Sequence, residues 1–206
     1  MTLTEGVAAL GLTLPPGAEE KLAAFIALLM KWNKVYNLTA IREPQAMVTQ
    51  HLLDSLAVLP LLQKSALAER HHSLADVGSG AGLPGMVLAI AQPEWRIVSI
   101  EAVEKKAAFQ RQACIELGLS NVSIHCGRVE RFHQRFDGVI ARAFASLGEF
   151  VTLAGHLSDR LWAMKGAYPA DEIAALPAGW RLAACHEIRV PGLPAERCLL
   201  QLEKGA

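Results

Sequence analysis

The sequence predicts an α/β fold of the doubly wound kind, with a mostly parallel, seven-stranded sheet preceded by an N-terminal helical extension. Three observations support this prediction. A glycine-rich loop joins an apolar run to a helix-compatible run, short apolar segments alternate with helical segments from residue 74 to 164, and two strand-like segments follow near the carboxyl end. We expect the helical extension over residues 1–70 and the sheet over residues 71–206, packed as one compact unit.

The first 70 residues carry the spacing of amphipathic helices. Apolar side chains that recur at helical intervals define one face of the first long helix: Leu22, Phe25, Ile26, Leu29 and Trp32. A second helix is expected from Pro44 to Leu62, with Pro44 in its first turn and Pro60 close to its end.

The alternating region predicts a parallel sheet with helices on both faces. Its expected elements are strand 74–77, helix 84–91, strand 96–101, helix 104–117, strand 122–125, strand 137–141, helix 147–158 and strand 161–164. Residues 180–190 and 197–203 then predict two strands joined by a Pro-Gly-Leu-Pro turn. They give the parallel sheet an antiparallel ending, which suits the methyltransferase version of the doubly wound fold better than the dehydrogenase version.

The loop from Asp76 to Gly85 reads Asp-Val-Gly-Ser-Gly-Ala-Gly-Leu-Pro-Gly and carries the strongest functional signal. Its glycines allow sharp turns and let a ligand approach the backbone closely. Glu101 ends the next strand, at the spacing where an acidic side chain accepts hydrogen bonds from ribose hydroxyls. The pattern therefore predicts a ligand that contains adenosine.

Two such ligands fit the loop. Residues 80–85 satisfy the dinucleotide pattern G-x-G-x-x-G, whereas an acidic residue followed by glycines at alternate positions fits S-adenosylmethionine. A dinucleotide brings an anionic pyrophosphate, but S-adenosylmethionine brings a sulfonium and an ammonium group. Nearby carboxylates, for which Asp76, Glu101 and Glu130 are candidates, favour the cationic ligand. The loop by itself leaves both ligands open.

Composition narrows the class of protein. Twenty basic residues balance twenty acidic residues, which argues against strong nonspecific binding of nucleic acid but not against a local basic patch. The four cysteines are widely spaced without a C-x-x-C pair, so we expect no metal site and no disulfide framework. The longest apolar run, residues 22–30, is too short to span a bilayer, and we expect a cytoplasmic protein.

Separate segments along the chain match the motifs of one family, and they are residues 32–39, 51–55, 76–85, 127–130, 137–143 and 165–166. The Asn-Leu-Thr and His-x-x-Asp-Ser elements near the amino end make the match specific. On these segments the chain resembles the bacterial 16S ribosomal RNA guanine-N7 methyltransferases (glucose-inhibited division protein B). The resemblance implies the class I S-adenosylmethionine-dependent fold. It also implies S-adenosylmethionine as methyl donor, S-adenosylhomocysteine as product, and a guanosine in the decoding-region loop of 16S rRNA as acceptor.

The resemblance also implies where the donor lies. Gly78 and Leu83 would line its pocket, Val129 and Glu130 would lie against the adenine, and Arg142 would close the far side. Together with the loop and ribose positions, the expected donor-binding residues are Asp76, Gly78, Gly80, Leu83, Glu101, Val129, Glu130 and Arg142. The expected partner is 16S rRNA within the small ribosomal subunit or its precursor. We expect the protein to act as a monomer and not to bind a membrane.

No catalytic residue is assigned, because guanine N7 has a free lone pair and needs neither a strong base nor a metal nor a cysteine. The positioning candidates are His51, Asp54, Arg142 and Lys165. His51, Asp54 and Ser55 share one helix face, which is either turned toward the ligand or solvated. Arg142 ends an apolar strand and must meet an anion there, which would be the donor's carboxylate, an RNA phosphate or a structural partner such as Asp76 or Asp137.

Two other functions remain open from the residues alone. A nicotinamide-dependent oxidoreductase would need a proton-handling Tyr-Lys pair or histidine near the site, and of the two tyrosines neither Tyr36 nor Tyr168 is well placed by spacing. A non-catalytic RNA-binding or assembly factor would be expected to have a degenerate glycine loop, whereas this loop is intact. The methyltransferase interpretation would place the target base against an aromatic ring such as Phe144.

Overall fold

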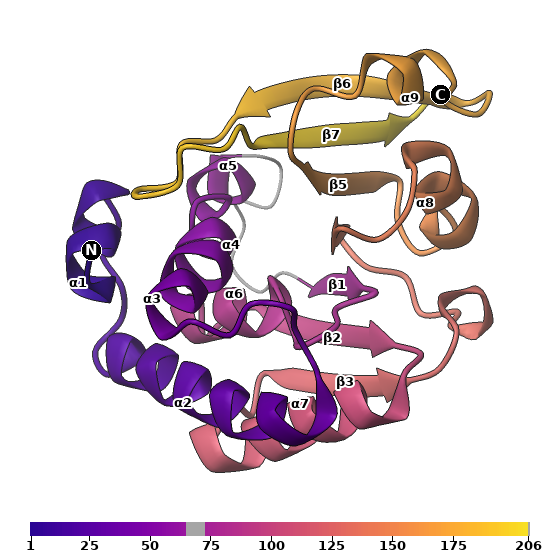
Figure 1. Ribbon diagram of the computed structural model, residues 1–206. Coiled ribbons are helices and arrows are strands. Elements are labelled where there is room, and N and C mark those ends of the chain that lie inside the picture. Colours follow the sequence, from indigo (N-terminus) through magenta and orange to yellow (C-terminus); the bar gives the residue numbers. More distant parts are fainter. Residues whose placement is uncertain (65–72, 206) are drawn as a thin grey trace.

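The computed structural model describes residues 1–64 and 73–205 of the chain (Figure 1). Seven strands form one sheet in the order β3-β2-β1-β4-β5-β7-β6. Their bounds are β1 Ser73–Val77, β2 Arg96–Glu101, β3 Val122–Cys126, β4 Gly138–Arg142, β5 Arg160–Lys165, β6 Trp180–Glu187 and β7 Cys198–Lys204. The first five strands are parallel, and β7 pairs antiparallel with both β5 and β6. The predicted fold class is confirmed, while the boundary expected at residue 70 lies outside the described residues.

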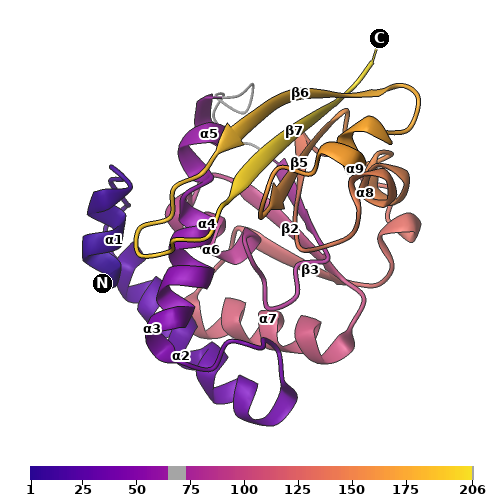
Figure 2. The ribbon, with the colours of Figure 1, turned by 45° about the horizontal axis from the view of Figure 1, so that its top comes forward.

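Helices cover both faces of this sheet because side chains alternate between the faces along each strand. Leu74 of β1 points into a core shared with α6 (Gly85–Ala91) and α7 (Glu104–Leu117). Ala75 and Val77 point into a second core, which α8 (Leu147–Ala154) covers. The short helix α9 (Ala170–Ala174) packs beside α8 on this second face (Figure 2).

The N-terminal helices belong to the first core. Helix α1 (Leu3–Ala9) precedes the long helix α2 (Ala18–Tyr36), which runs beside α7. Phe25 and Trp32 of α2 place their rings 5.9 and 5.7 Å from that of Phe109 on α7. The apolar face predicted for α2 is therefore the face that packs against the sheet-covering helices.

The second predicted helix is wrong as a single element. Residues 44–64 form α3 (Pro44–Met47), a π-helical segment η1 (Val48–Leu53), a short α4 (Asp54–Leu56) and a separate α5 (Leu59–Lys64). Pro60 does not end a helix but lies in the first turn of α5, where its missing N–H removes no helical hydrogen bond. The wide turn of η1 is explained below by what it contacts.

Smaller differences concern element ends. Helix α8 ends at Ala154 rather than at residue 158, and β6 ends at Glu187 rather than at residue 190. Helices α1 and α9 and the 3-10 turn η2 (Val129–Arg131) were not expected. None of the helices within residues 1–64 and 73–205 has the length and apolarity that a membrane span requires.

Candidate functional site

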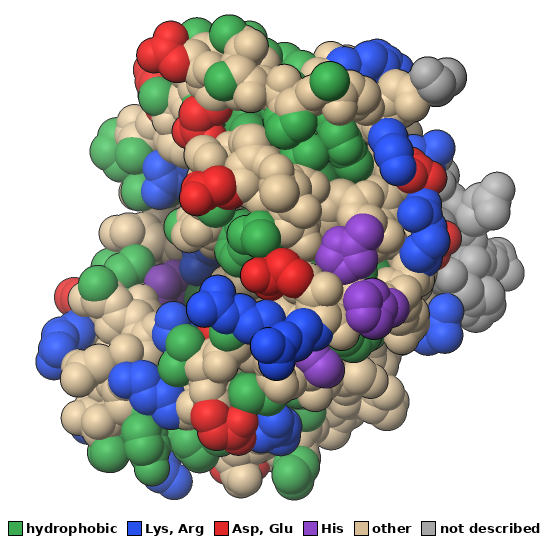
Figure 3. Space-filling view, turned by 90° about the vertical axis from the view of Figure 1, so that its right-hand side faces the viewer, with side chains coloured by type: hydrophobic (Ala, Val, Ile, Leu, Met, Phe, Trp, Pro, Cys, Tyr) green, Lys and Arg blue, Asp and Glu red, His purple; other side chains and the backbone are tan. Residues whose placement is uncertain are grey.

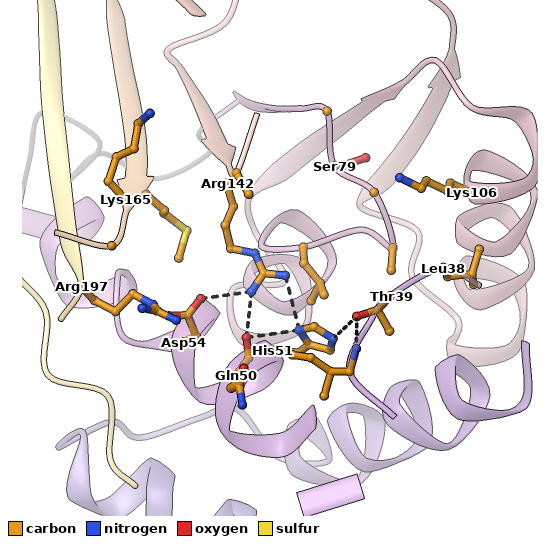
Figure 4. A pocket seen from close by; sticks show the side chains of 18 residues that line it. Leu38, Thr39, Gln50, His51, Asp54, Ser79, Lys106, Arg142, Lys165 and Arg197 are labelled. Atoms are coloured by element: carbon orange, nitrogen blue, oxygen red, sulfur yellow. Dashed lines mark hydrogen bonds and ion pairs between the residues drawn. The ribbon is translucent and has the colours of Figure 1, made fainter. Parts of the chain in front are cut away.

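A cavity of about 530 Å³ opens at the carboxyl ends of β1, β4 and β5. This is the edge where parallel α/β sheets bind ligands, next to the point between β1 and β4 where the strand order reverses. We call it the sheet-edge cavity. Its lining residues are Leu38, Thr39, Ile41, Gln50, His51, Asp54, Gly78, Ser79, Gly80, Ala81, Leu83, Lys106, Arg142, Ala143, Met164, Lys165, Gly166 and Arg197 (Figure 4).

The glycine loop forms one wall of the cavity. Gly78, Gly80 and Gly82 have φ angles of +65°, +59° and +82°, a region that L side chains rarely adopt. The Glu101 carboxylate holds the loop in place, because its Oε2 accepts a hydrogen bond from the Gly80 N–H at 2.7 Å. Its Oε1 accepts a second hydrogen bond, from the Val103 N–H at 2.8 Å. Glu101 is only 5% exposed and does not line the cavity.

Asp76 lies behind this wall rather than in it. Its side chain is fully buried, and Oδ2 accepts a hydrogen bond from the Gly85 N–H at 2.7 Å, at the start of α6. Within the described part of the chain Oδ1 has no hydrogen-bond partner. Burial raises the pKa of Asp76 from 3.8 to about 7, because an ionised carboxylate loses its hydration there.

The far wall of the cavity is built around Arg142, at the end of β4. Its Nη1 donates to the Gln50 carbonyl oxygen at 2.9 Å and to Asp54 Oδ2 at 3.1 Å, while Nη2 lies 3.5 Å from His51 Nδ1. Arg197, just before β7, donates from Nε to Asp54 Oδ1 at 3.0 Å. The structural anion of Arg142 is thus Asp54, whereas the sequence suggested Asp76 or Asp137.

His51 faces the cavity as a neutral imidazole. Its Nε2 lies 3.0 Å from Thr39 Oγ1, and the residue is 4% exposed. Burial and the neighbouring Arg142 guanidinium lower the pKa of His51 from 6.5 to about 4. Ser55 on the same helical segment is fully buried, so it does not lie on a solvated helix face.

Basic side chains surround the opening. Lys165, at the end of β5, donates to Glu172 Oε2 at 2.8 Å and to the Ala145 carbonyl oxygen at 2.9 Å. Lys106 enters from α7 on the other side, near Leu38 and Ser79 (Figure 4). On the face toward which β1–β3 point in Figure 1, Lys and Arg side chains gather beside a hollow (Figure 3). The basic side chains of the lining can therefore meet anionic groups of a ligand, such as a carboxylate or a phosphate, although Asp54 and Glu172 already pair with three of them.

The structure brings together a majority of the residues singled out in the sequence. Those that line the cavity are His51, Asp54, Gly78, Gly80, Leu83, Arg142 and Lys165. Those that do not are Asp76, Glu101, Val129 and Glu130. Val129 is buried in the second core and Glu130 is exposed on η2, beyond β3.

Gln50, Lys106 and Arg197 are cavity residues that sequence reasoning did not place there. The position of Arg197 could have been predicted from the sequence. It is the first residue of the last predicted strand, and the start of an antiparallel strand lies at the same sheet edge as the ends of the parallel strands. The Gln50 backbone carbonyl oxygen accepts a hydrogen bond from Arg142. Any residue could supply this carbonyl, so the sequence could not predict the contact.

Comparisons with known proteins agree with this geometry. A family model described as "GidB: rRNA small subunit methyltransferase G" matches residues 18–200. The chain belongs to this family. As a member it is a methyltransferase, which rules out the oxidoreductase and the non-catalytic assembly factor. Among the residues that the structure describes, no group of three or more His, Cys, Asp or Glu side chains could hold a metal ion.

The curated relatives span the whole chain. "Ribosomal RNA small subunit methyltransferase G" of Azoarcus sp. (strain BH72) is 57% identical over 98% of this chain and 95% of that protein. The protein of the same name from Aromatoleum aromaticum is 54% identical over 99% and 98%.

Solved structures share the class I methyltransferase fold at low identity. TrmN from Thermus thermophilus has a TM-score of 0.58 at 21% identity, covering 76% of this chain and 53% of that chain. A mutant of MtNAS in complex with S-adenosylmethionine has a TM-score of 0.60 at 15% identity, covering 91% and 76%.

Proposed function

We propose that this chain transfers a methyl group from S-adenosylmethionine to N7 of a guanosine in the decoding-region loop of 16S rRNA, within the small ribosomal subunit or its precursor. The observation that carries the proposal is the sheet-edge cavity of a GidB-family chain, where an intact glycine loop faces a set of basic side chains. The proposal includes action as a monomer in the cytoplasm, where these subunits are found.

The residues present fit the donor. A Cβ built on Gly80 meets no atom within 4 Å, so the loop leaves open space for a ligand against its backbone. Glu101 does not line the cavity, but each of its oxygens accepts only one backbone hydrogen bond, so lone pairs remain that the proposal assigns to ribose hydroxyls at the edge of the loop. Arg142 would hold the donor's carboxylate. The remaining donor-binding residues of the proposal are Asp76, Gly78, Leu83, Val129 and Glu130.

S-adenosylmethionine would supply a methyl group that its sulfonium makes electrophilic. The chain's own residues then need only position the acceptor, because N7 attacks with a lone pair and no proton has to leave. His51 is neutral at pH 7, so it adds no positive charge beside a base that becomes cationic. Asp54, held between Arg142 and Arg197, fixes both guanidinium groups at the wall of the cavity.

RNA would enter from the basic side of the opening. Lys106 and Lys165 lie on opposite sides of the cavity in Figure 4, where each could meet a phosphate. For Lys165 this contact would replace or share its ion pair with Glu172. Phe144 lies against Gly78, since a Cβ there would come within 2.3 Å of its ring, and it would provide a stacking surface for the target base.

The test is transfer of labelled methyl from S-adenosylmethionine to small ribosomal subunits from cells that lack this protein, with the product mapped as N7-methylguanosine. Label at one guanosine of the decoding-region loop is the expected result. Label at another nucleotide would discard the proposed target, and absence of label would discard the acceptor altogether.

Donor identity has its own measurement. We expect S-adenosylhomocysteine, but not NAD, to raise the melting temperature, because a ligand that binds only the folded chain stabilises it. Arg142→Ala should remove this shift. The matched control is Arg135→Ala, which removes an exposed arginine paired with Asp159 and should keep the shift. A shift with NAD alone would overturn the donor assignment.

A further inference from the structure

A second cavity of about 720 Å³ lies beside the first, between the segment that follows β5 and the turn between β6 and β7. Gly166 and Arg197 line both cavities, so the two adjoin at this rim. We call the second one the hairpin cavity. Its other lining residues include Tyr168, Glu187, Ile188, Arg189, Val190 and Glu196.

Tyr168 is the aromatic side chain of this cavity, and it is 56% exposed. Its backbone is held in place. The Ala170 N–H donates to the Tyr168 carbonyl oxygen at 3.2 Å, and Pro169 restricts Tyr168, the residue that precedes it, to extended conformations. Since this segment is already ordered, a ligand that stacks on the ring would cost little additional conformational entropy.

The remaining lining does not select for charge. Arg189 and Arg197 are balanced by Glu187 and Glu196, and Arg189 lies 3.1 Å from Glu187. Ile188 and Val190 form a buried apolar floor at 7% and 5% exposure. An apolar floor with balanced charges and an exposed ring suits a planar, uncharged group better than a phosphate.

We propose that the hairpin cavity binds the base of a nucleotide adjacent to the methylated guanosine, stacked on Tyr168. The inference rests on the proposed function. A guanosine that enters the sheet-edge cavity has to leave its stack, and a neighbouring base then loses a stacking partner. Because the two cavities meet at Gly166 and Arg197, the same strand can reach both, and the tyrosine ring replaces the lost partner.

The experiment is methyl transfer by Tyr168→Ala to small subunits from cells that lack this protein. We expect the KM for subunits to rise about tenfold, equivalent to about 1.4 kcal/mol, with kcat and S-adenosylhomocysteine binding unchanged. Tyr168→Phe should retain the wild-type KM. The control Ile115→Ala truncates a side chain that is 75% exposed near the far end of α7, and it should change nothing.

Tyr168→Leu separates a base from a protein partner. Leucine keeps apolar area but has no ring face, so a stacked base predicts a KM close to that of Tyr168→Ala. If Tyr168→Leu matches wild type, the cavity holds an apolar side chain of a protein component, and the inference is overturned. An unchanged KM in Tyr168→Ala also overturns it.

Binding of subunits without donor keeps this test separate from the proposed function. If wild-type protein transfers no methyl, the proposed function fails, but the dissociation constants of wild type and Tyr168→Ala still decide the inference. A weaker complex for Tyr168→Ala supports it. Equal binding, including no binding by either protein, contradicts it.

Discussion

Helix α7 and residues 44–62 were both predicted as single helices, and only α7 is one. Helix α7 runs without interruption from Glu104 to Leu117, covers the sheet and ends at Gly118 in the left-handed region. Residues 44–64 consist of four elements, because the π-helical segment η1 lies between α3 and α4 and a separate α5 follows. The regular helix mainly provides apolar packing, whereas the irregular one also supplies site contacts.

The π-helical turn η1 lies where this part of the chain contacts Arg142. Gln50, His51 and Asp54 all meet Arg142, through a backbone carbonyl, a ring nitrogen and a carboxylate. A strictly regular helix engages its interior carbonyls along its axis and turns them less readily toward a neighbour. Single π turns occur often at functional sites for this reason. Four kinds of substitution test this difference between the packing role of α7 and the site role of residues 44–64.

The largest effect is expected from Asp54→Ala. The Asp54 side chain is 4% exposed and pairs with Arg142 and Arg197, so its removal leaves two half-buried guanidinium groups without their anion. We expect a loss of about 3–5 kcal/mol in the free energy of unfolding, measured by urea denaturation. Asp159→Ala, which breaks an exposed pair with Arg135, should cost less than about 1 kcal/mol. Equal losses in the two variants would refute a structural role for Asp54.

The next effect is on activity. Arg142→Lys keeps a positive charge but cannot reach Gln50, Asp54 and the ligand with a planar, forked group. We expect kcat/KM to fall on the order of 100-fold, as for loss of a pre-positioned donor. Lys106→Arg on α7 preserves charge at a single point contact and should change kcat/KM by less than about threefold. A mild effect of Arg142→Lys would show that charge alone suffices at this wall.

The third prediction concerns pH and pairs His51 with Asp76. Because the folded pKa of His51 is about 4 rather than 6.5, its contribution is complete above pH 6.5 and is lost as the pH falls toward 4. Asp76 acts in the opposite direction. Its folded pKa is about 7 rather than 3.8, so its contribution is complete below pH 3.8 and is lost as the pH rises toward 7.

The two slopes should nearly cancel in the wild type, each being about 1.4 kcal/mol per pH unit. His51→Asn should therefore lose stability with rising pH between about 5 and 6, whereas Asp76→Asn should gain it. Urea denaturation at those two pH values measures both slopes. Parallel behaviour of wild type and both variants would contradict the buried, oppositely shifted groups.

The smallest effect is expected in the regular helix. Gly118 ends α7 with φ +62°, and a Cβ there meets no atom within 4 Å, so Gly118→Ala carries only backbone strain of about 1 kcal/mol. Methyl transfer should stay at the wild-type rate, measured in the same assay. Gly78→Ala is the contrast to this small effect, because it adds a clash with the Phe144 ring to similar strain and should weaken S-adenosylhomocysteine binding in the melting-temperature measurement. If Gly118→Ala also impaired methyl transfer, the carboxyl end of α7 would have more than a packing role.

The residues that were predictable are those whose role follows from local pattern. Alternation of apolar segments gave the five parallel strands, and glycine spacing gave the loop, because both depend on neighbours along the chain. The break in residues 44–64 was not predictable, since Arg142, which Gln50 and Asp54 contact, lies 88 residues after Asp54. The place of Arg142 at a strand end could be predicted from its apolar strand. Its anion could not, because choosing among Asp54, Asp76 and Asp137 requires knowing which loops meet.

The pair of arginines on Asp54 has a consequence for the order of synthesis. Asp54 lies 88 residues before Arg142 and 143 residues before Arg197, which directly precedes the last strand. Most of the sheet can form while the ribosome is still extending the chain, but this wall closes only after β7 has emerged. A nascent chain therefore carries a glycine loop before it carries a complete cavity, and the wall around Asp54 is complete only once Arg197 has been synthesised.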